Sequence, residues 1–313
     1  MRWLAENSPD AVADALRAVA PELSGHEVIV RETLDEEDPQ WWAASAMVGE
    51  QYVAKFAWSH PAALRVAHEI DVLAALAHEP DVPFLPEVVA SSTDPVLLVT
   101  RRVPGTALFD IADSIDRDHA GRQLAVFLAA LHQAFERVDH LVGGLQPVLL
   151  LPATTQTIRA GIGRWIRPDQ IESVMRWCDW ADDVLASPAP TVLAHGDFHG
   201  GNQVWHGDEL RVVIDFETVG TAEPEYDLRT FPGTGPGIEL LQATMRHYQQ
   251  ISGRHLSPER VMAWHLRTAL GDALWRSEAG VPLPDHRTPV AWVDDLAARL
   301  GSVLHRAAGE EEG

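Results

Sequence analysis

The chain has 313 residues, 46% of them hydrophobic and 22% charged, which predicts a globular protein with ample material for a core. Its formal net charge of −22 at pH 7 argues against a nucleic-acid partner, because a phosphate backbone binds basic surfaces. Its one cysteine, Cys178, excludes an intramolecular disulfide, and no run approaches the roughly 18 apolar residues of a membrane-spanning helix. The amphipathic N-terminus does not resemble a signal peptide, so we expect a cytoplasmic protein without a membrane partner.

The chain up to residue 102 has the pattern of a small antiparallel sheet. Ser8 and Pro9 are typical of a helix start, and Gly49-Glu50 is typical of a tight turn. Helices are predicted over 8–23 and 60–79, and strands over 26–34, 41–48, 51–58, 88–90 and 96–100. This part is therefore predicted to be a five-stranded sheet accompanied by one long helix.

The rest of the chain is predicted to be mainly helical. Helices are expected over 118–135, 168–186, 237–251, 257–279 and 290–307. A short strand over 191–194 leads into a loop over 195–202, and a hairpin then pairs 203–206 with 211–214. The acidic tail 309–313 is predicted to be disordered.

The chain contains a single lysine, Lys55, among 24 lysines and arginines. It ends a strand-like run, and a position that keeps lysine against this background favours a compact ammonium over a planar guanidinium. Glu69 follows fourteen residues later inside a helical pattern, where it can pair with Lys55. A strand lysine and a helix glutamate in this order are two parts of a kinase-type phosphoryl-transfer site.

The loop that begins at His195 supplies the other parts of such a site. Asp197 and Asn202 are five residues apart, so the carboxylate can face a substrate hydroxyl while the amide turns to a metal. Asp215 follows the apolar strand 212–214 and would project into the same cleft. We therefore predict Asp197 as the catalytic base, Asn202 and Asp215 as Mg²⁺ ligands, and Lys55, held by Glu69, as the group that binds the nucleotide phosphates.

The segment His195-Gly196-Asp197-Phe198-His199-Gly200-Gly201-Asn202, followed by Val212-Val213-Ile214-Asp215-Phe216-Glu217, resembles the signature of the aminoglycoside phosphotransferase family. That family also includes choline, homoserine and macrolide kinases. The run 97–105 is similar to the family's hinge, and 220–228 to its post-catalytic segment, in which Asp227 anchors the following helix. The resemblance covers roughly residues 25–280.

The resemblance implies an α+β, protein-kinase-like fold with a nucleotide-binding lobe over 1–102, a hinge near 100–105 and a helical catalytic lobe over 103–313. It also implies ATP or GTP as the phosphoryl donor, Mg²⁺ as cofactor, and pairing of the base with backbone groups of Thr100, Arg101 and Arg102. The implied activity is transfer of the γ-phosphate to a hydroxyl of a small molecule. An aminoglycoside or related antibiotic is the first acceptor class, and a choline-like or homoserine-like metabolite is the alternative.

Two features distinguish the chain from a protein kinase. Gly196 stands where a protein kinase has arginine, and the stretch from Asp215 to Pro224 is too short for a regulatory activation loop. Both favour a small-molecule acceptor and a constitutively formed site. The turn over 35–40 departs from the family, because four carboxylates and no glycine stand where backbone N–H groups usually cover the phosphates.

The acceptor is predicted to be a small molecule, and the acidity of the chain is compatible with a cationic one. The candidate acceptor residues are Glu223, Glu225, Arg229, Asp272 and Trp275. A stripe on the helix over 257–279 that includes Trp275 is also consistent with simple core packing. The chain is expected to act as a monomer or a homodimer.

Two further hypotheses remain open at the level of sequence. The acidic turn is compatible with a non-catalytic pseudokinase that binds a nucleotide without transferring phosphate. The H-x-D-x-H spacing of His195, Asp197 and His199, with His206, is compatible with a zinc hydrolase. The hydrolase hypothesis leaves Lys55, Asn202 and Asp215 without a role.

Overall fold

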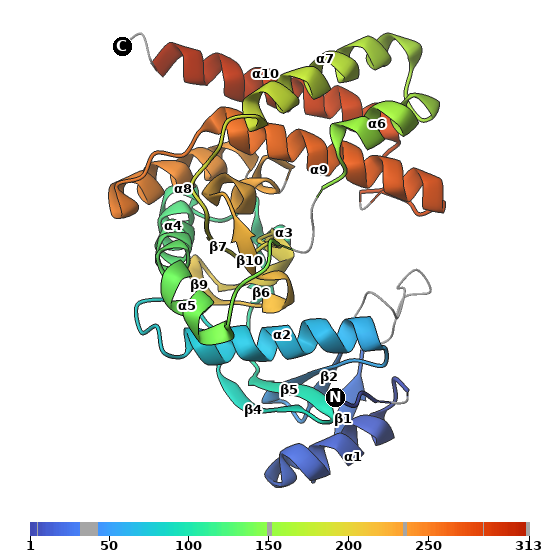
Figure 1. Ribbon diagram of the computed structural model, residues 1–313, viewed down its shortest axis with the longest axis vertical. Coiled ribbons are helices and arrows are strands. Elements are labelled where there is room, and N and C mark those ends of the chain that lie inside the picture. Colours follow the sequence, from blue (N-terminus) through green and yellow to red (C-terminus); the bar gives the residue numbers. More distant parts are fainter. Residues whose placement is uncertain (5, 32–42, 149–151, 234–236, 284, 311–313) are drawn as a thin grey trace.

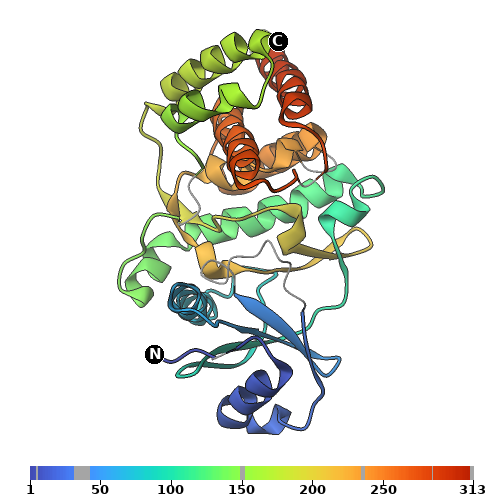
Figure 2. The same cartoon turned by 90° about the vertical axis from the view of Figure 1, so that its right-hand side faces the viewer.

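The computed structural model describes the chain except residues 5, 32–42, 149–151, 234–236, 284 and 311–313. A small part built on an antiparallel sheet is joined to a larger, mainly helical part (Figures 1 and 2). This is the predicted α+β arrangement, with the sheet first in the chain and the helices after it. The acidic turn over 35–40 lies outside the described residues.

The five-stranded sheet of the small part has the order β1-β2-β3-β5-β4, and every neighbouring pair is antiparallel. Its strands are β1 (Val28–Val30), β2 (Ala44–Val48), β3 (Tyr52–Phe56), β4 (Val88–Thr93) and β5 (Val96–Arg101). Lys55 lies on the central strand β3 opposite Leu98 of β5. The strands confirm the predicted ones, although β1 ends sooner than expected within the described residues.

Two helices accompany the sheet. Helix α1 (Pro9–Val19) begins at Ser8, whose side chain accepts a hydrogen bond from the backbone N–H of Ala11, and α2 (His60–Leu76) begins in the same way at Ser59. Helix α1 ends four residues before the predicted boundary, because Pro21 starts a separate turn of 3₁₀ helix, η1 (Pro21–Leu23). In Figure 1, α2 lies between the sheet and the helical part.

The large part contains the five predicted long helices. They are α4 (Arg117–Gln133), α7 (Pro168–Leu185), α8 (Gly237–Ser252), α9 (Pro258–Ala279) and α10 (Pro289–Glu310). Helix α10 continues through two residues of the tail predicted to be disordered, and the last three lie outside the described residues. Among the described residues, none of the helices has both the length and the apolar composition needed to cross a membrane.

Short elements of the large part were not predicted from the sequence. They are β6 (Thr106–Ala107), α3 (Leu108–Ile111), α5 (Phe135–Val142), α6 (Thr155–Gly161) and β10 (Gly220–Ala222). Strand β7 (Val192–Ala194) pairs with β10, and β6 extends the hairpin of β8 (Gln203–His206) and β9 (Glu209–Val213). Strand pairs of only two or three residues depend on tertiary contacts, so no local sequence pattern predicts them.

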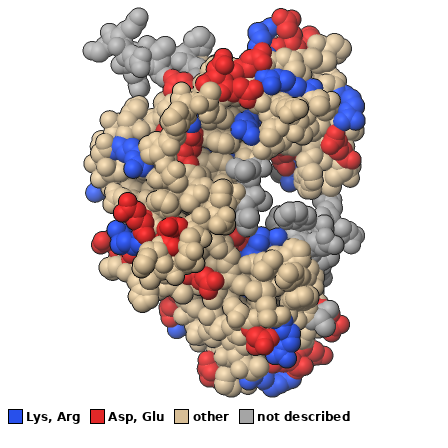
Figure 3. Space-filling model, in the orientation of Figure 1, with Lys and Arg blue, Asp and Glu red and all other residues tan. Residues whose placement is uncertain are grey.

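One continuous apolar core joins the two parts. It contains Val66 and Leu73 of α2, Leu98 of β5, and Leu124 and Leu128 of α4, all buried. Helix α2 is therefore packed against the large part as well as against the sheet. The predicted division of the chain at residue 102 stays a prediction, since this core crosses it. Figure 3 shows the surface hollowed between the two parts, on the right of that view.

Candidate active site

A cavity of about 500 Å³ lies where the sheet meets the large part. Lys55 and Glu69 line it from the small part, and Asn202 and Asp215 line it from the large part. Four residues of the predicted hinge also line it, Thr100, Arg101, Arg102 and Val103. The structure therefore brings together, around one cavity, residues that lie up to 160 positions apart in the chain.

Lys55 is bound by Glu69, as predicted from the order of the two residues. Its Nζ lies 2.7 Å from Oε2 of Glu69, which is buried on α2. The same ammonium lies 2.5 Å from Oδ1 of Asp215. The other oxygen of Glu69 accepts a hydrogen bond of 3.0 Å from the backbone N–H of Phe216. Helix α2 thus fixes both the lysine and the turn that follows Asp215.

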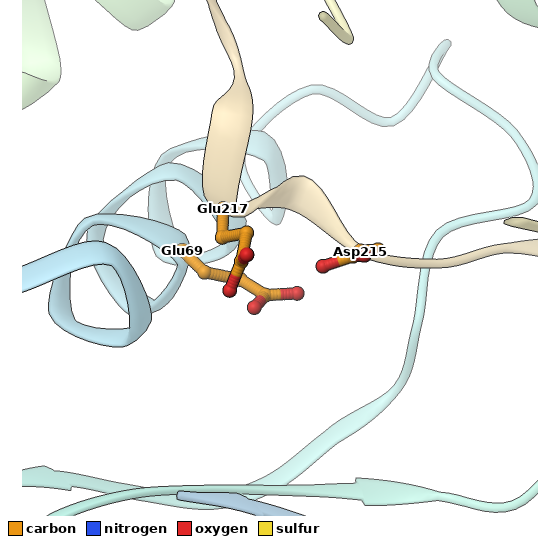
Figure 4. Close-up of side chains that lie close together, drawn as sticks. All are labelled: Glu69, Asp215 and Glu217. Atoms are coloured by element: carbon orange, nitrogen blue, oxygen red, sulfur yellow. The ribbon is translucent and has the colours of Figure 1, made fainter. Parts of the chain in front are cut away.

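The turn after Asp215 gathers three carboxylates around the lysine. Asp215 itself has a left-handed conformation (φ 71°, ψ 63°), which aspartate tolerates better than most residues. This conformation starts the 3₁₀ turn η4 (Phe216–Thr218), and Glu217 on that turn comes to lie 3.0 Å from Lys55. Figure 4 shows the carboxylates of Glu69, Asp215 and Glu217 pointing toward one another, within 4.8 Å.

Electrostatics favour a charged lysine in this cluster. Burial acts to lower the pKa of Lys55, but the charges of Asp215, Glu69 and Glu217 outweigh it and hold that pKa well above its usual value. Burial raises the pKa of Glu69. Lys55 acts to lower that pKa, but the negative charges of Asp215 and Glu217 add to the effect of burial, so the pKa stays raised. Negative charge thus exceeds positive charge around the lysine.

A hard cation suits the donor atoms that the site offers. Asp215 supplies carboxylate oxygens, and the excess negative charge of the cluster favours a bound cation. The amide nitrogen of Asn202 donates 2.9 Å to the backbone oxygen of Asp197, which leaves the amide oxygen of Asn202 as the free ligand atom. Carboxylate and amide oxygens are ligands that Mg²⁺ prefers. The residues present therefore fit the predicted metal.

Asp197 sits at the start of the loop that also carries Asn202. Its Oδ2 lies 3.5 Å from Nε2 of His199 and 3.4 Å from the amide nitrogen of Asn202. Burial acts to raise the pKa of Asp197, but hydrogen bonding and charge from His199 outweigh it and lower that pKa. Asp197 is therefore ionised near neutral pH and able to accept a proton from, or orient, a nearby hydroxyl.

Asp227 holds the start of the loop over 195–202 in place. The backbone N–H groups of His195 and Gly196 each donate 2.9 Å to the Asp227 carboxylate, and His132 of α4 contacts it at 3.2 Å. Gly196 has a φ of +83°, and a Cβ there would lie 2.5 Å from the backbone oxygen of Thr218. Glycine is therefore required at this position by the packing of the loop.

Arg229 supports the same loop. Its guanidinium donates 2.7 Å to the backbone oxygen of Gly196 and 3.1 Å to that of Tyr226, and it lies 3.9 Å from Oδ1 of Asp197. The side chain is buried and packs over the ring of Tyr226. Its place is thus beside the predicted base, where it holds the loop, and its charge already has partners within the protein.

The other predicted acceptor residues lie around α9 and do not line the cavity. Glu223 accepts hydrogen bonds from Arg260 and Trp264 of that helix, and Glu225 accepts one of 3.0 Å from the backbone N–H of Ser257. Asp272 pairs with Arg276 at 3.0 Å, while Trp275 is 54% exposed. The structure does not gather these four side chains into one site.

The hinge has one backbone donor that sequence reasoning missed. The N–H of Arg101 bonds to the oxygen of Glu87 at 2.9 Å, and the N–H of Arg102 bonds to that of Gln51 at 2.7 Å. The N–H of Val103 has no backbone partner among the described residues. Because Pro104 follows, Val103 is the last hinge donor, and Pro104 was the local signal for it.

Glu217 is the second residue that sequence reasoning left without a role. It was visible as the residue two positions after Asp215, which an extended chain would place on the same face but farther along the chain. The left-handed conformation of Asp215 and the 3₁₀ turn instead bring Glu217 to 3.0 Å from the same lysine. No local signal in the sequence specifies this turn.

The zinc hypothesis conflicts with the contacts of His195. Its Nδ1 accepts the backbone N–H of Asp197 at 3.3 Å, and its Nε2 donates to the backbone oxygen of Ile214 at 3.1 Å. Both ring nitrogens are therefore in use. Burial lowers the pKa of His195, in keeping with a neutral structural role.

Comparison with known proteins agrees with this geometry. The family model described as "Phosphotransferase enzyme family" matches residues 33–264. No curated protein sequence matches the chain significantly.

Solved structures of three kinds resemble the whole chain. The GDP complex of aminoglycoside 2'-phosphotransferase-IIIa superposes with a TM-score of 0.70 at 16% identity, over 96% of this chain and 99% of that one. Macrolide 2'-phosphotransferase MphH from Brachybacterium faecium superposes with a TM-score of 0.61 at 21% identity, over 92% of this chain and 97% of that one. A choline/ethanolamine kinase family protein from Mesorhizobium loti gives 0.64 at 19% identity, over 94% of each chain. These likenesses confirm the predicted kinase-like fold, and with the family model they show that the chain belongs to the phosphotransferase enzyme family.

Proposed function

We propose that this protein is a Mg²⁺-dependent small-molecule kinase that transfers the γ-phosphoryl group of ATP to a hydroxyl. The observation that carries the proposal is the meeting of Lys55, Glu69, Asn202 and Asp215 around one cavity, with Asp197 on the loop beside them. A pseudokinase would need neither an ionised Asp197 nor a complete set of metal ligands. The intact set therefore favours catalysis.

Each residue has a task that follows from its position. Lys55 binds nucleotide phosphates through its ammonium, which the surrounding carboxylates keep charged. Asn202 and Asp215 would hold Mg²⁺, which would supply positive charge beside the nucleotide phosphates. Asp197 orients the acceptor hydroxyl and takes its proton, and Arg229 keeps the Asp197 loop in place.

The hinge favours adenine over guanine as the base. The N–H of Arg101 bonds to the oxygen of Glu87, the residue before β4. Backbone groups repeat their direction every two residues along a strand, so the carbonyl of Arg101 and the N–H of Val103 face the same side of the chain. An acceptor followed by a donor complements the amine and ring nitrogen of adenine. Guanine presents a carbonyl and an N–H in the opposite order, so ATP is the proposed donor.

The proposed acceptor is a hydroxyl-bearing small molecule, with amine-bearing antibiotics such as aminoglycosides first. The net charge of −22 supports a cationic acceptor, because such a surface attracts cations. Similar structures are named for aminoglycosides, macrolides and choline or ethanolamine. A choline-like or homoserine-like metabolite is therefore the alternative.

The test is ADP formation from ATP and Mg²⁺ with a panel of acceptors. The panel contains aminoglycosides, macrolides, choline, ethanolamine and homoserine, and product mass confirms the addition of a phosphoryl group. Transfer to one of these classes identifies the acceptor. Nucleotide binding without transfer to any acceptor would favour the pseudokinase.

A further inference from the structure

Glu217 is the third carboxylate beside Lys55, and the reaction outlined above gives it no task. It lies on η4, two residues after Asp215, and its side chain is 12% exposed. Its Oε2 is 3.0 Å from Nζ of Lys55, and its Oε1 is 3.5 Å from Nε of Arg65 on α2. Glu217 therefore lies between the lysine and a second buried cation.

The lysine has an unused donor on the side of Glu217. An ammonium has three N–H donors, and two of them bond to Oε2 of Glu69 and Oδ1 of Asp215. Oε2 of Glu217 is buried and makes no hydrogen bond among the described residues, although it is close enough to Lys55 for a strong charge interaction. The contact between Nζ and Oε2 is therefore an ion pair at 3.0 Å, on the lysine beside its two hydrogen-bonded carboxylates.

Asp215 is a poor permanent partner for the lysine. If Asp215 ligates a divalent cation, the Lys55 ammonium would share that carboxylate with a second positive charge, which weakens its own attraction to Asp215. Glu69 and Glu217 are the two carboxylates that remain for Lys55 when Asp215 ligates a metal. Losing a partner from a buried charge is costly, so a second carboxylate beside Glu69 keeps the lysine in place.

Glu69 and Glu217 come from two elements that are joined firmly. Glu69 accepts the backbone N–H of Phe216 at 3.0 Å, and Nε2 of His68 donates to the backbone oxygen of Val219 at 2.7 Å. Helix α2 and the turn η4 therefore move as one unit. Glu69 and Glu217 therefore keep their spacing to each other, and both stay beside the lysine of β3.

We propose that Glu217 is a positioning residue which, together with Glu69, holds the Lys55 ammonium in the geometry that binds nucleotide phosphates while Asp215 ligates the metal. Arg65 orients Glu217 for this task. The inference rests on the proposed function, because it requires Lys55 to bind a nucleotide. It gives Glu217 no direct contact with substrate or metal.

The test is a double-mutant cycle on ATP affinity, measured by calorimetry with and without Mg²⁺. Glu217→Gln keeps the shape of the side chain and is expected to weaken ATP binding about tenfold, the value of one hydrogen bond to a charged group. In a Lys55→Met background the same change is expected to cost nothing further. Glu209→Gln, at an exposed glutamate of β9, is the matched control and leaves the affinity unchanged.

Three results would overturn the inference. An equal loss in both backgrounds means that Glu217 acts through something other than Lys55. An unchanged ATP affinity together with a higher Mg²⁺ requirement means that Glu217 is a metal ligand. A wild-type protein that binds no ATP overturns the proposed function itself, which the wild-type measurement alone reveals.

Protein folding is checked in every variant by its melting temperature without nucleotide. Glu217→Asp serves if Glu217→Gln does not fold, because it keeps the charge but withdraws the carboxylate by one methylene. It is expected to weaken ATP binding less than the amide does, and again only when Lys55 is present. If Glu217→Asp binds ATP as tightly as the wild type, the position of the Glu217 carboxylate beside Lys55 does not matter, which would contradict the inference.

Discussion

Asp197 is the residue on which the proposed chemistry depends most directly, because its ionised carboxylate lies beside Asn202 and Arg229 on the loop next to the cavity. Asp197→Asn keeps the shape of the side chain but removes the acceptor of the hydroxyl proton. We expect kcat to fall roughly 10²- to 10⁴-fold with little change in the KM for ATP. Steady-state kinetics measure this, with Asp208→Asn on the exposed hairpin turn as control. Full activity of Asp197→Asn would remove the assigned role.

Val103 allows a test of base recognition by a single backbone atom. Val103→Pro removes the hinge N–H while keeping an apolar side chain, and we expect the KM for ATP to rise about three- to tenfold. Val103→Ala retains the N–H and is expected to behave as the wild type. Equal effects of the two substitutions would show that the side chain, and not the N–H, binds the base.

At the scale of single residues, sequence spacing pointed to Lys55, Glu69, Asn202 and Asp215, and these four side chains line one cavity. Each occupies a characteristic position on a strand, helix or loop, which is why the pattern could find them. Glu217 could not be placed in this way. Its direction depends on the left-handed conformation of Asp215, which tertiary contacts with α2 enforce. Side chains are predictable where the element fixes their direction, and much less so after an irregular turn.

At the scale of elements, the contact of α9 with α10 depends on a buried neutral histidine. Nδ1 of His265 donates to the backbone oxygen of Arg229 at 2.7 Å, and its Nε2 accepts from Arg299 at 2.7 Å. Burial, with the charge of Arg299, lowers the pKa of His265 to about 3. Protonation would place a second positive charge against Arg299 and remove the acceptor.

The sign of the pH dependence follows from this depressed pKa. The unfolded chain binds a proton at His265 near its usual pKa of about 6.5, whereas the folded protein does not until about pH 3. The contribution to stability is therefore complete above pH 6.5 and is lost as the pH falls, at up to about 1.4 kcal/mol per pH unit. Urea unfolding between pH 7 and 4 measures the slope.

His265→Gln should make that slope shallower without removing it, because the buried His195 also has a lowered pKa. Exposed His255 provides the control substitution, His255→Gln, which should leave the slope as it is. A slope that is the same in His265→Gln and the wild type would show that His265 is already protonated in the folded protein.

Elements with a clear period were predictable, and short ones were not. The amphipathic pattern located α2, α4, α7, α8 and α9 to within a few residues, since each exposes one face and buries another. Strands β6 and β10 contain two and three residues and exist only because β8 and β7 lie beside them. Helix α5 begins at Phe135, two residues after α4 ends, where the sequence predicts one helix over 118–135 and none beyond it.

At the scale of the whole molecule, one core runs from α2 into the large part, while the sheet and α1 enclose a second core of their own. The cavity lies at this junction and takes residues from both sides. Ligand binding there should stabilise the entire fold, because it links the two parts. The acidic turn over 35–40 lies outside the described residues, so its effect on nucleotide binding stays a question that ligand binding can test.

The melting temperature with ATP and with GTP, each with and without Mg²⁺, tests the central claim most directly. A nucleotide at 100 times its dissociation constant adds about 2.7 kcal/mol, which raises the melting temperature by about 4 °C for a chain of this length. We predict a Mg²⁺-dependent rise with ATP that exceeds the rise with GTP. No rise with either nucleotide at millimolar concentration would contradict the account of this site as a nucleotide-dependent phosphotransferase.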